Sequence, residues 1–283
     1  MKSICLLTLA TLWGFLSCST APKRPAETFS TRNMAENYLE LANKTADQGK
    51  HEEALRMLEE ARRIGVSVDD PRLLIRERIA RGNVLAALGR SGEAAEVWDS
   101  ALAEASAAGD QELAASVRIY IARNRLSSGA SGAEAVRDQV KQDIASMKTE
   151  KLAIAFGWVV IGLAERELGR WTEGEAALTQ ALKYHEKNNY LEKAAEDWYL
   201  IASIRSVSGQ YDRALEALRN ALAFDRRAEN SYGLGMDWRA IGDVQTKAGN
   251  RQEALAAYRR AIAVFRSIDL EPEAAAVEAR LPE

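Results

Sequence analysis

Residues 198–218 read WYLIASIRSVSGQYDRALEAL, and four positions within this stretch decide the fold. They are Trp198, Ala202, Gly209 and Ala214, so a bulky aromatic residue is followed by a small residue at i+4, a glycine at i+11 and an alanine at i+16. Residues i and i+4 lie on one face of an α-helix, and a glycine just beyond such a pattern is a typical helix stop. The stretch therefore predicts the end of one helix, a tight turn and the start of a second helix.

The same pattern recurs along the chain with a period of forty residues. A small residue lies seven positions before each marker glycine, and alanine recurs five and twelve positions after it. The third copy departs from the pattern, because Glu134 and Lys141 occupy its two alanine columns. In the aromatic column, Arg78 and Arg118 replace the bulky aromatic residue in the second and third copies. A fixed period of this length predicts an array of repeats in which each repeat stacks on its neighbours. The marker glycines are Gly49, Gly89, Gly129, Gly169, Gly209 and Gly249.

The composition favours helices throughout the array. No proline occurs between Pro71 and Pro272, whereas the good helix formers Ala, Leu, Glu and Arg are abundant. Small residues at a helix crossing let two backbones approach, and the bulky residue of the pattern is expected to fill the space beside them. Each repeat is therefore predicted to be a pair of antiparallel helices, and the fold class is all-α.

Two segments carry a resemblance to a known family. Residues 158–162 (WVVIG) and 209–215 (GQYDRAL) resemble the tetratricopeptide repeat, whose pattern is W-x2-L-G-x2-Y followed by A-x3-F. The resemblance covers residues 35–268 as six repeats, although the period is forty instead of 34 and the family's terminal proline is absent. It implies a right-handed α-α superhelix, a solenoid of about six helical hairpins. Residues 269–283, in which Pro272 stands in the first turn, are expected to form a C-terminal capping helix.

The first eighteen residues predict a secretion signal and a lipid anchor. Residues 4–16 are apolar but too short to cross a hydrocarbon core of ~30 Å, which takes about 20 helical residues. The segment Phe15-Leu16-Ser17-Cys18 resembles the lipobox of bacterial lipoproteins, although its leucine is one place nearer the cysteine than usual. We expect residues 1–17 to be a lipoprotein signal peptide, Cys18 to be lipidated and residues 18–34 to be a flexible tether. An ordinary signal peptide that contains a cysteine is the alternative.

A lipid anchor of this kind implies a location in the bacterial cell envelope, with the folded part facing the periplasm. No aspartate follows Cys18, and in enterobacterial lipoproteins an aspartate there signals inner-membrane retention. The outer membrane is therefore slightly favoured. The formal net charge of −3 gives no footprint of a nucleic-acid binder, so nucleic acid is not expected as a partner.

The sequence lacks the common motifs of catalytic, phosphate-binding and metal-binding sites. His51 and His185 are each followed by a glutamate, but neither has the second histidine of the H-E-x-x-H zinc motif. No phosphate-binding loop of the G-x-x-x-x-G-K-[ST] type and no G-x-S-x-G nucleophile elbow occur. Both cysteines, Cys5 and Cys18, precede the repeats. We therefore expect no enzyme activity, no cofactor and no metal site.

The resemblance does imply a binding face. In the tetratricopeptide family the ligand-facing positions lie thirteen, ten and six residues before the marker glycine, on the concave side of the superhelix. Some of these positions carry arginines, which suit an acidic partner, and the fourth repeat is apolar at all three. Internal pairing of the arginines and simple burial of the apolar helix both stay open as alternatives. The candidate partner-binding residues are Arg76, Arg123, Phe156, Val159, Leu163, Tyr199 and Met236.

The predicted function is that of a non-catalytic, lipid-anchored scaffold or adaptor, which holds another cell-envelope protein or peptide in its concave groove. The alternative is a ligand-binding accessory lipoprotein of a transport system, which an internal pore or a closed pocket would favour. Neither function needs a cofactor, and in both the protein is expected to attach to the membrane only through the lipid anchor.

Two features of the core can be anticipated. Trp158, Trp198 and Trp238 are expected to be largely buried between paired helices. In the third repeat, Glu134 and Asp138 fall where the other repeats have core residues, and a buried charge must be paired or leave the interior. Either these carboxylates pair with the arginines of the aromatic column, or the helix turns so that its own apolar stripe faces inward. The second arrangement is preferred, and the stripe is Val136, Val140 and Ile144.

Replacing Cys18 with alanine should move the protein from the membrane fraction to the soluble periplasmic fraction, because the acyl chains contribute about 0.8 kcal/mol per buried CH₂. Fractionation followed by immunoblotting measures this, with Cys5→Ala as the matched control that should leave membrane association unchanged. Membrane association that survives the Cys18 change would contradict the lipoprotein interpretation.

Overall fold

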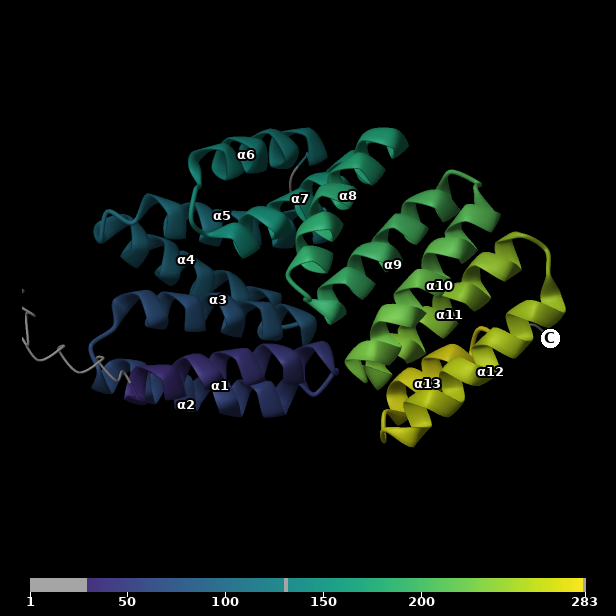
Figure 1. Cartoon of the computed structure of the whole chain (residues 1–283), viewed down its shortest axis with the longest axis horizontal. Helices are drawn as coiled ribbons and strands as arrows, with labels where there is room; N and C mark the ends of the chain where they lie inside the picture. Colours follow the sequence, from purple (N-terminus) through teal and green to yellow (C-terminus); the bar gives the residue numbers. More distant parts are fainter. Residues whose placement is uncertain (1–29, 130–131, 282–283) are drawn as a thin grey trace, which may run out of the picture.

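The computed structural model describes residues 30–129 and 132–281, and over these residues the chain forms thirteen helices (Figure 1). In chain order they are α1 (Ser30–Asp47), α2 (His51–Ser67), α3 (Pro71–Ala87), α4 (Ser91–Ala107), α5 (Gln111–Ser127), α6 (Ala133–Ser146), α7 (Lys151–Glu167), α8 (Trp171–Lys187), α9 (Leu191–Val207), α10 (Tyr211–Ala228), α11 (Ser231–Lys247), α12 (Arg251–Ser267) and α13 (Glu271–Glu278).

The helices pair into six hairpins, from α1 with α2 to α11 with α12, and α13 packs on α12. Each hairpin also contacts the next, and the odd-numbered helices touch one another in succession from α1 to α11. The odd-numbered helices therefore line the inner, concave side of the array. The predicted solenoid of about six hairpins with a C-terminal capping helix is confirmed.

A helix of seventeen residues followed by a short turn is the unit that generates the period. Helices α2, α3, α4 and α5, for example, each contain 17 residues. The marker glycine ends the first helix of a hairpin in the left-handed region, with φ of 78° at Gly209. Most second helices end twenty residues later at another residue with positive φ. Two units of twenty residues give the forty-residue repeat. The residues that end the second helices in this way are Asp69, Gly109, Asn189, Glu229 and Asp269.

The contact at the hairpin crossing differs from the one expected. In the second repeat Gly82 of α3 faces Trp98 of α4, and a Cβ on Gly82 would lie 2.2 Å from the indole Nε1. Trp98 is buried, and its Nε1 donates a hydrogen bond to the carbonyl oxygen of Ile79 at 3.2 Å. The large side chain that fills the crossing thus belongs to the second helix, nine positions after the marker glycine. The corresponding pairs are Gly162 with Leu178 and Gly242 with Tyr258.

The three tryptophans of the aromatic column are partly buried and lie at the edge of the core. Trp158, Trp198 and Trp238 each pack one side against the largest core cluster. The guanidinium of Arg260 lies over the ring of Trp238, 4.5 Å from its centroid. These rings lie at the margin of the core because side chains of the second helix already occupy its deepest places.

In the third repeat the helix has turned as preferred. Val136 and Val140 of α6 are buried and Ile144 is partly buried, whereas Glu134 and Asp138 are exposed. The apolar stripe of α6 therefore faces inward, and the two carboxylates stay in contact with solvent. This turn avoids placing unpaired charges in the core.

The arginines of the aromatic column pair with other partners than those expected. The Nη2 of Arg118 lies 2.6 Å from Oδ1 of Asp143, whose side chain is 3% exposed. Arg78 pairs with Glu104 of α4. The partly exposed Arg118 thus pairs with the one carboxylate of α6 that does enter the core.

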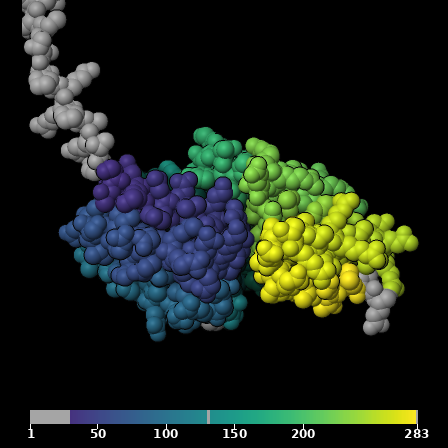
Figure 2. Space-filling view, turned by 90° about the horizontal axis from the view of Figure 1, so that it is seen from below, coloured from purple at the N-terminus to yellow at the C-terminus, as the bar shows by residue number. Residues whose placement is uncertain are grey.

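The superhelix curves until its first hairpin meets its C-terminal half. Lys193 of α9 donates a hydrogen bond to Asp47 at the end of α1, with 3.0 Å between Nζ and Oδ1. A Cβ on Gly49 would lie 2.8 Å from Cδ2 of Tyr232 in α11. The N-terminal helices accordingly lie beside the C-terminal ones in the space-filling view (Figure 2). Segments 146 residues apart thus close one side of the array.

Helix α1 begins at Ser30, so residues 30–34 of the expected tether belong to a helix. Its first turn precedes Ala35, the first residue of α1 that is buried against the rest of the repeat. The expected signal peptide (1–17), the lipidated Cys18 and the remainder of the tether lie outside the described residues. Over the part that the structure covers, no helix combines the length and the apolarity needed to cross a membrane.

Replacing Gly82 with alanine should lower the melting temperature, because the new Cβ would overlap the buried indole of Trp98 and overpacking costs about 1–3 kcal/mol. Gly92 in α4 is the matched control, since a Cβ there meets nothing within 4 Å. Gly92→Ala should instead stabilise the protein, by roughly 0.5–1 kcal/mol. Thermal denaturation followed by circular dichroism measures both, and equal effects would contradict the close crossing.

Candidate binding pocket on the concave face

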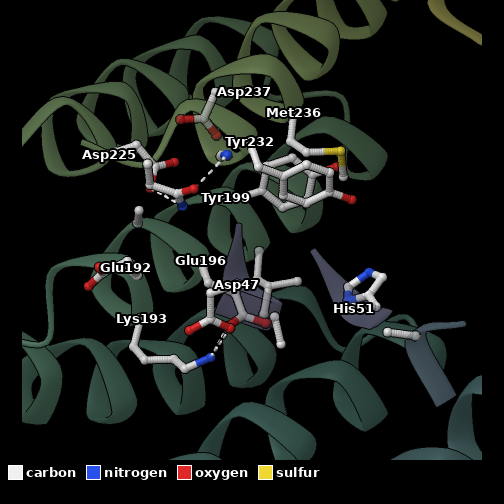
Figure 3. A pocket seen from close by; sticks show the side chains of 16 residues that line it. Asp47, His51, Glu192, Lys193, Glu196, Tyr199, Asp225, Tyr232, Met236 and Asp237 are labelled. Atoms are coloured by element: carbon white, nitrogen blue, oxygen red, sulfur yellow. Dashed lines mark hydrogen bonds and ion pairs between the residues drawn. The ribbon is translucent and has the colours of Figure 1, made fainter. Parts of the chain in front are cut away.

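A pocket of about 400 Å³ lies on the concave side, between the first hairpin and helices α9 and α11 (Figure 3). Residues one turn apart on α9 and on α11 share the face that lines it. The pocket exists because the superhelix brings its first hairpin back onto α9 and α11. Its lining includes Asp47 and His51 from the first hairpin, Glu192, Lys193, Glu196 and Tyr199 from α9, and Tyr232, Met236 and Asp237 from α11.

Of the candidates named from the sequence, Tyr199 and Met236 line this pocket and the other five do not. Val159 and Leu163 are 5% and 7% exposed and belong to the largest core cluster. Phe156 stacks on Tyr120 of α5, with 4.4 Å between the ring centroids. The apolar face of the fourth repeat is thus largely used by packing.

The two arginine candidates differ from each other. Arg76 lies 3.3 Å from Glu36 and 3.7 Å from Glu150, so neighbouring helices already supply its partners. Arg123 of α5 is half-buried and makes no ion pair with any residue in the described ranges. Burial lowers the pKa of the Arg123 guanidinium. Of these two candidates, Arg123 is therefore the one that remains available for an acidic partner group.

One wall of the pocket is an ion-pair cluster. The Nζ of Lys193 lies 3.0 Å from Oδ1 of Asp47 and 3.4 Å from Oε2 of Glu196. Desolvation acts against the charge of Lys193, but the two carboxylates outweigh it and raise the pKa of the ammonium group. For Asp47, desolvation raises the pKa of the carboxyl group and outweighs the attraction of Lys193, which lowers it. This cluster ties the first hairpin to α9.

The opposite wall holds a pair of buried carboxyl groups, Asp225 of α10 and Asp237 of α11, which are 3% and 2% exposed. The Nδ2 of Asn230 donates a hydrogen bond to Oδ1 of Asp225 at 2.9 Å. Oδ2 of Asp237 has no hydrogen-bond partner within the described part of the chain. Gly233 makes room for the pair, because a Cβ there would lie 2.1 Å from Oδ2 of Asp225.

Burial raises the pKa of Asp225 to about 7 and that of Asp237 to about 9. The neighbouring carboxyl of Asp225 adds to the shift of Asp237. Near neutral pH the pair therefore keeps at least one proton, because two adjacent buried carboxylates repel each other. The proton belongs to the pair more than to either residue.

The two positions that Asp225 and Asp237 occupy can be compared with the equivalent positions in the neighbouring repeats. Forty residues earlier, the same two positions hold His185 and Asp197, which are buried with 2.6 Å between Nδ1 and Oδ2. Burial raises the pKa of Asp197 to about 6, against its hydrogen bond with His185. Forty residues later the positions hold Phe265 and Val277, both buried. Neither aspartate is among the residues predicted from the sequence, although the change from His185 to Asp225 within one column of the repeat is a signal for the pair.

The groups in the pocket do not form a metal centre: in the described ranges, no three His, Cys, Asp or Glu side chains are placed to hold an ion. The arrangement offers carboxylate acceptors, two tyrosine rings and a methionine thioether. Such a set binds groups by hydrogen bonding, charge and aromatic contact.

Residues 194–267 match the family model of the tetratricopeptide repeat. The match spans α9 to α12, the helices that include two walls of the pocket. Residues 194–267 therefore contain tetratricopeptide repeats, and the same arrangement of helical hairpins continues through the other described residues. Among curated proteins, none matches the chain.

Three solved structures illustrate the similarity of the fold. Bacillus thuringiensis PlcR, in complex with the peptide PapR7 and DNA, shares 12% identity and a TM-score of 0.56 over 89% of this chain and 76% of its own. PilW, a widely conserved type IV pilus biogenesis factor, shares 14% identity and a TM-score of 0.52 over 82% of this chain and 94% of its own. Aspartyl phosphate phosphatase F from Bacillus subtilis shares 11% identity and a TM-score of 0.59 over 90% of this chain and 79% of its own. This fold therefore occurs in binding proteins and in a protein named as an enzyme.

The Asp237→Asn variant should be more stable than the unaltered protein at pH 8. Because the folded-state pKa of Asp237 is about 9 against an ordinary value of 3.8, the folded state holds a proton that the unfolded state has released, and stability falls as pH rises between these values. The charged groups that act on Asp237 are Asp225 and Arg226 of α10. Glu192 and Glu196 of α9 act on Asp225. The gain at pH 8 should be roughly 1–3 kcal/mol, the usual cost of an unsatisfied buried polar group.

Urea denaturation at pH 5 and pH 8 measures this effect. Asp197→Asn is the matched control, because it changes the same column one repeat earlier but removes a carboxylate that is paired with His185. That variant should gain less stability at pH 8 than Asp237→Asn does, because the pKa of Asp197 is raised only to about 6 and its carboxylate is hydrogen-bonded to His185. A loss of stability of Asp237→Asn at pH 8 would contradict the assignment of a strained carboxyl pair.

Proposed function

We propose that this protein is a non-catalytic, lipid-anchored adaptor of the bacterial cell envelope, which holds a segment of another envelope protein on its concave face. The observation that carries the proposal is the pocket between the first hairpin, α9 and α11. Tyr199 and Met236 lie there at two of the positions that face ligands in tetratricopeptide repeats. Tyrosine and methionine are enriched at protein interfaces.

The size of the pocket favours a segment over a folded surface. Its volume of about 400 Å³ lies in the range of sites that enclose a small ligand or a few side chains. A partner would therefore insert one or two residues as an anchor and lay the adjoining chain along the odd-numbered helices. The PlcR structure, which contains the peptide PapR7, supports peptide binding by this fold.

The proposed anchor limits the distance between the first repeat and the membrane. If Cys18 carries the lipid, twelve residues (18–29) precede α1, and an extended chain spans at most about 3.3–3.6 Å per residue. The first repeat would then lie within about 40 Å of the bilayer. An adaptor in this position meets partners at the membrane surface. The similarity in fold to PilW, a pilus biogenesis factor, is in keeping with an assembly role.

A ligand-binding accessory of a transport system is the second candidate, and the pocket is the observation that favours it. A cavity of this volume also suits a small molecule. The two candidates differ in what occupies the pocket in the cell, because a protein segment can be cross-linked there and recovered, whereas a small ligand leaves no protein adduct.

A photo-crosslinking amino acid at Met236 should form an adduct with one envelope protein in intact cells, because this side chain lines the pocket. The matched control is the same amino acid at Glu216, which is exposed on α10 and does not line the pocket. We expect at least a tenfold excess of adduct at position 236, measured by immunoblotting and mass spectrometry. Equal adducts at both positions, or none at position 236, would contradict the proposed function.

A further inference from the structure

Carboxyl groups outnumber basic groups in the pocket. Five acidic residues line it, against Lys193 and His51. Lys193 is already shared between two of the acidic residues. The carboxyl groups left without a basic partner in the pocket lie at the end formed by α10 and α11, together with Glu192. A ligand that enters this end meets hydrogen-bond acceptors and negative charge. The five acidic residues are Asp47, Glu192, Glu196, Asp225 and Asp237.

A second observation is independent of this count. Asp237 is 2% exposed, lines the pocket and leaves Oδ2 without a hydrogen-bond partner in the part of the chain that the structure covers. A buried acceptor without a donor costs about 1–3 kcal/mol. Figure 3 shows the carboxyl groups of Asp237 and Asp225 on the same side of the pocket. Besides the proton that the two carboxyl groups share near neutral pH, the pair therefore still has one oxygen, Oδ2 of Asp237, without a partner.

The fold does not require this arrangement. One repeat earlier the same place holds a carboxylate satisfied by His185, and one repeat later it holds the apolar pair Phe265 and Val277. Either solution would stabilise the junction between α10 and α11 better than two adjacent carboxyl groups. The pair is thus unusual among these three equivalent junctions, and it is the one of the three whose residues line the pocket.

Aromatic rings complete the site. Tyr199 and Tyr232 line the pocket beside Met236 (Figure 3). A cation near the face of such a ring is attracted by its quadrupole, more strongly when water is excluded. Carboxyl groups at one side and tyrosine rings at another are the surroundings that suit a positively charged organic group.

We propose that the pocket binds a primary ammonium group, with Asp225 and Asp237 as hydrogen-bond acceptors and the rings of Tyr199 and Tyr232 beside it. An ammonium group is compact and has three donors, which suits two carboxyl groups that meet at one point better than the planar fork of a guanidinium does. The ammonium group is the free N-terminus or a lysine side chain of the partner segment, and in this respect the inference rests on the proposed function. A free alkylamine is the other source of the same chemistry.

Calorimetric titration of the full chain in detergent tests the proposal with four probes. They are the amidated peptide Ala-Phe-Leu with a free N-terminus, its N-acetylated form, the N-acetylated peptide Ala-Lys-Leu, and n-butylamine. At least one of the two peptides that carry an ammonium group should bind at least tenfold more tightly than N-acetyl-Ala-Phe-Leu. Which of the two binds identifies the N-terminus or lysine as the source.

Variants assign the binding to the pocket. Asp237→Asn should weaken binding of the preferred peptide at least tenfold, whereas the repeat-matched control Asp197→Asn, which does not line the pocket, should leave it unchanged. Tyr199→Leu provides a second variant if the first alters the circular dichroism spectrum. A tenfold loss is expected there as well.

The outcomes separate the two proposals. Equal binding of the acetylated and free peptides, with no effect of Asp237→Asn, would overturn the ammonium site while leaving peptide binding intact. Binding of n-butylamine alone, sensitive to Asp237→Asn, would support the ammonium site and count against a peptide partner. Binding of none of the four probes would overturn the ammonium site.

Discussion

The close crossing of two helices within each hairpin is the contact on which the array depends. At this point a small residue of the first helix, such as Gly82 or Gly242, receives a large side chain of the second. The approach sets the spacing of the hairpin, and its recurrence along the array contributes to the curvature of the chain. Because each hairpin packs on the next, a small rotation at every junction accumulates along the array. The pocket is a product of that accumulated curvature.

Local features of the fold could be predicted from the sequence because they depend on neighbouring residues. Gly209 ends a helix through its own backbone, and the apolar stripe from Val136 to Ile144 turns α6 inward through its own spacing. The position of Trp198 at the edge of the core was not predicted, because it depends on the partner residue that fills the hairpin crossing. That partner belongs to another helix, and the column that contains Trp98 and Leu178 varies too much in residue type to stand out.

The site was less predictable than the fold. Family positions led to Tyr199 and Met236, since each lies on the concave side of its own helix. They could not lead to Asp47 or His51. These residues line the pocket only because the curvature of the whole array brings the first hairpin beside α9 and α11. Nor did any motif signal Asp237, whose unusual surroundings follow from the replacement of histidine by Asp225 one repeat after His185. A single side chain changed the chemistry of a junction whose backbone stayed the same.

The contact between Lys193 and Asp47 has a mechanical consequence. Helix α1 forms one wall of the pocket and is also the first described helix of the chain. Tension applied to the N-terminus therefore acts directly on that wall, whereas α9 and α11 are held by the repeats around them. Such tension would pull on the ion pair between Lys193 and Asp47, in which 3.0 Å separate Nζ and Oδ1. Separation of Lys193 from Asp47 would free the end of α1 and open that side of the pocket, without any change in α9 or α11.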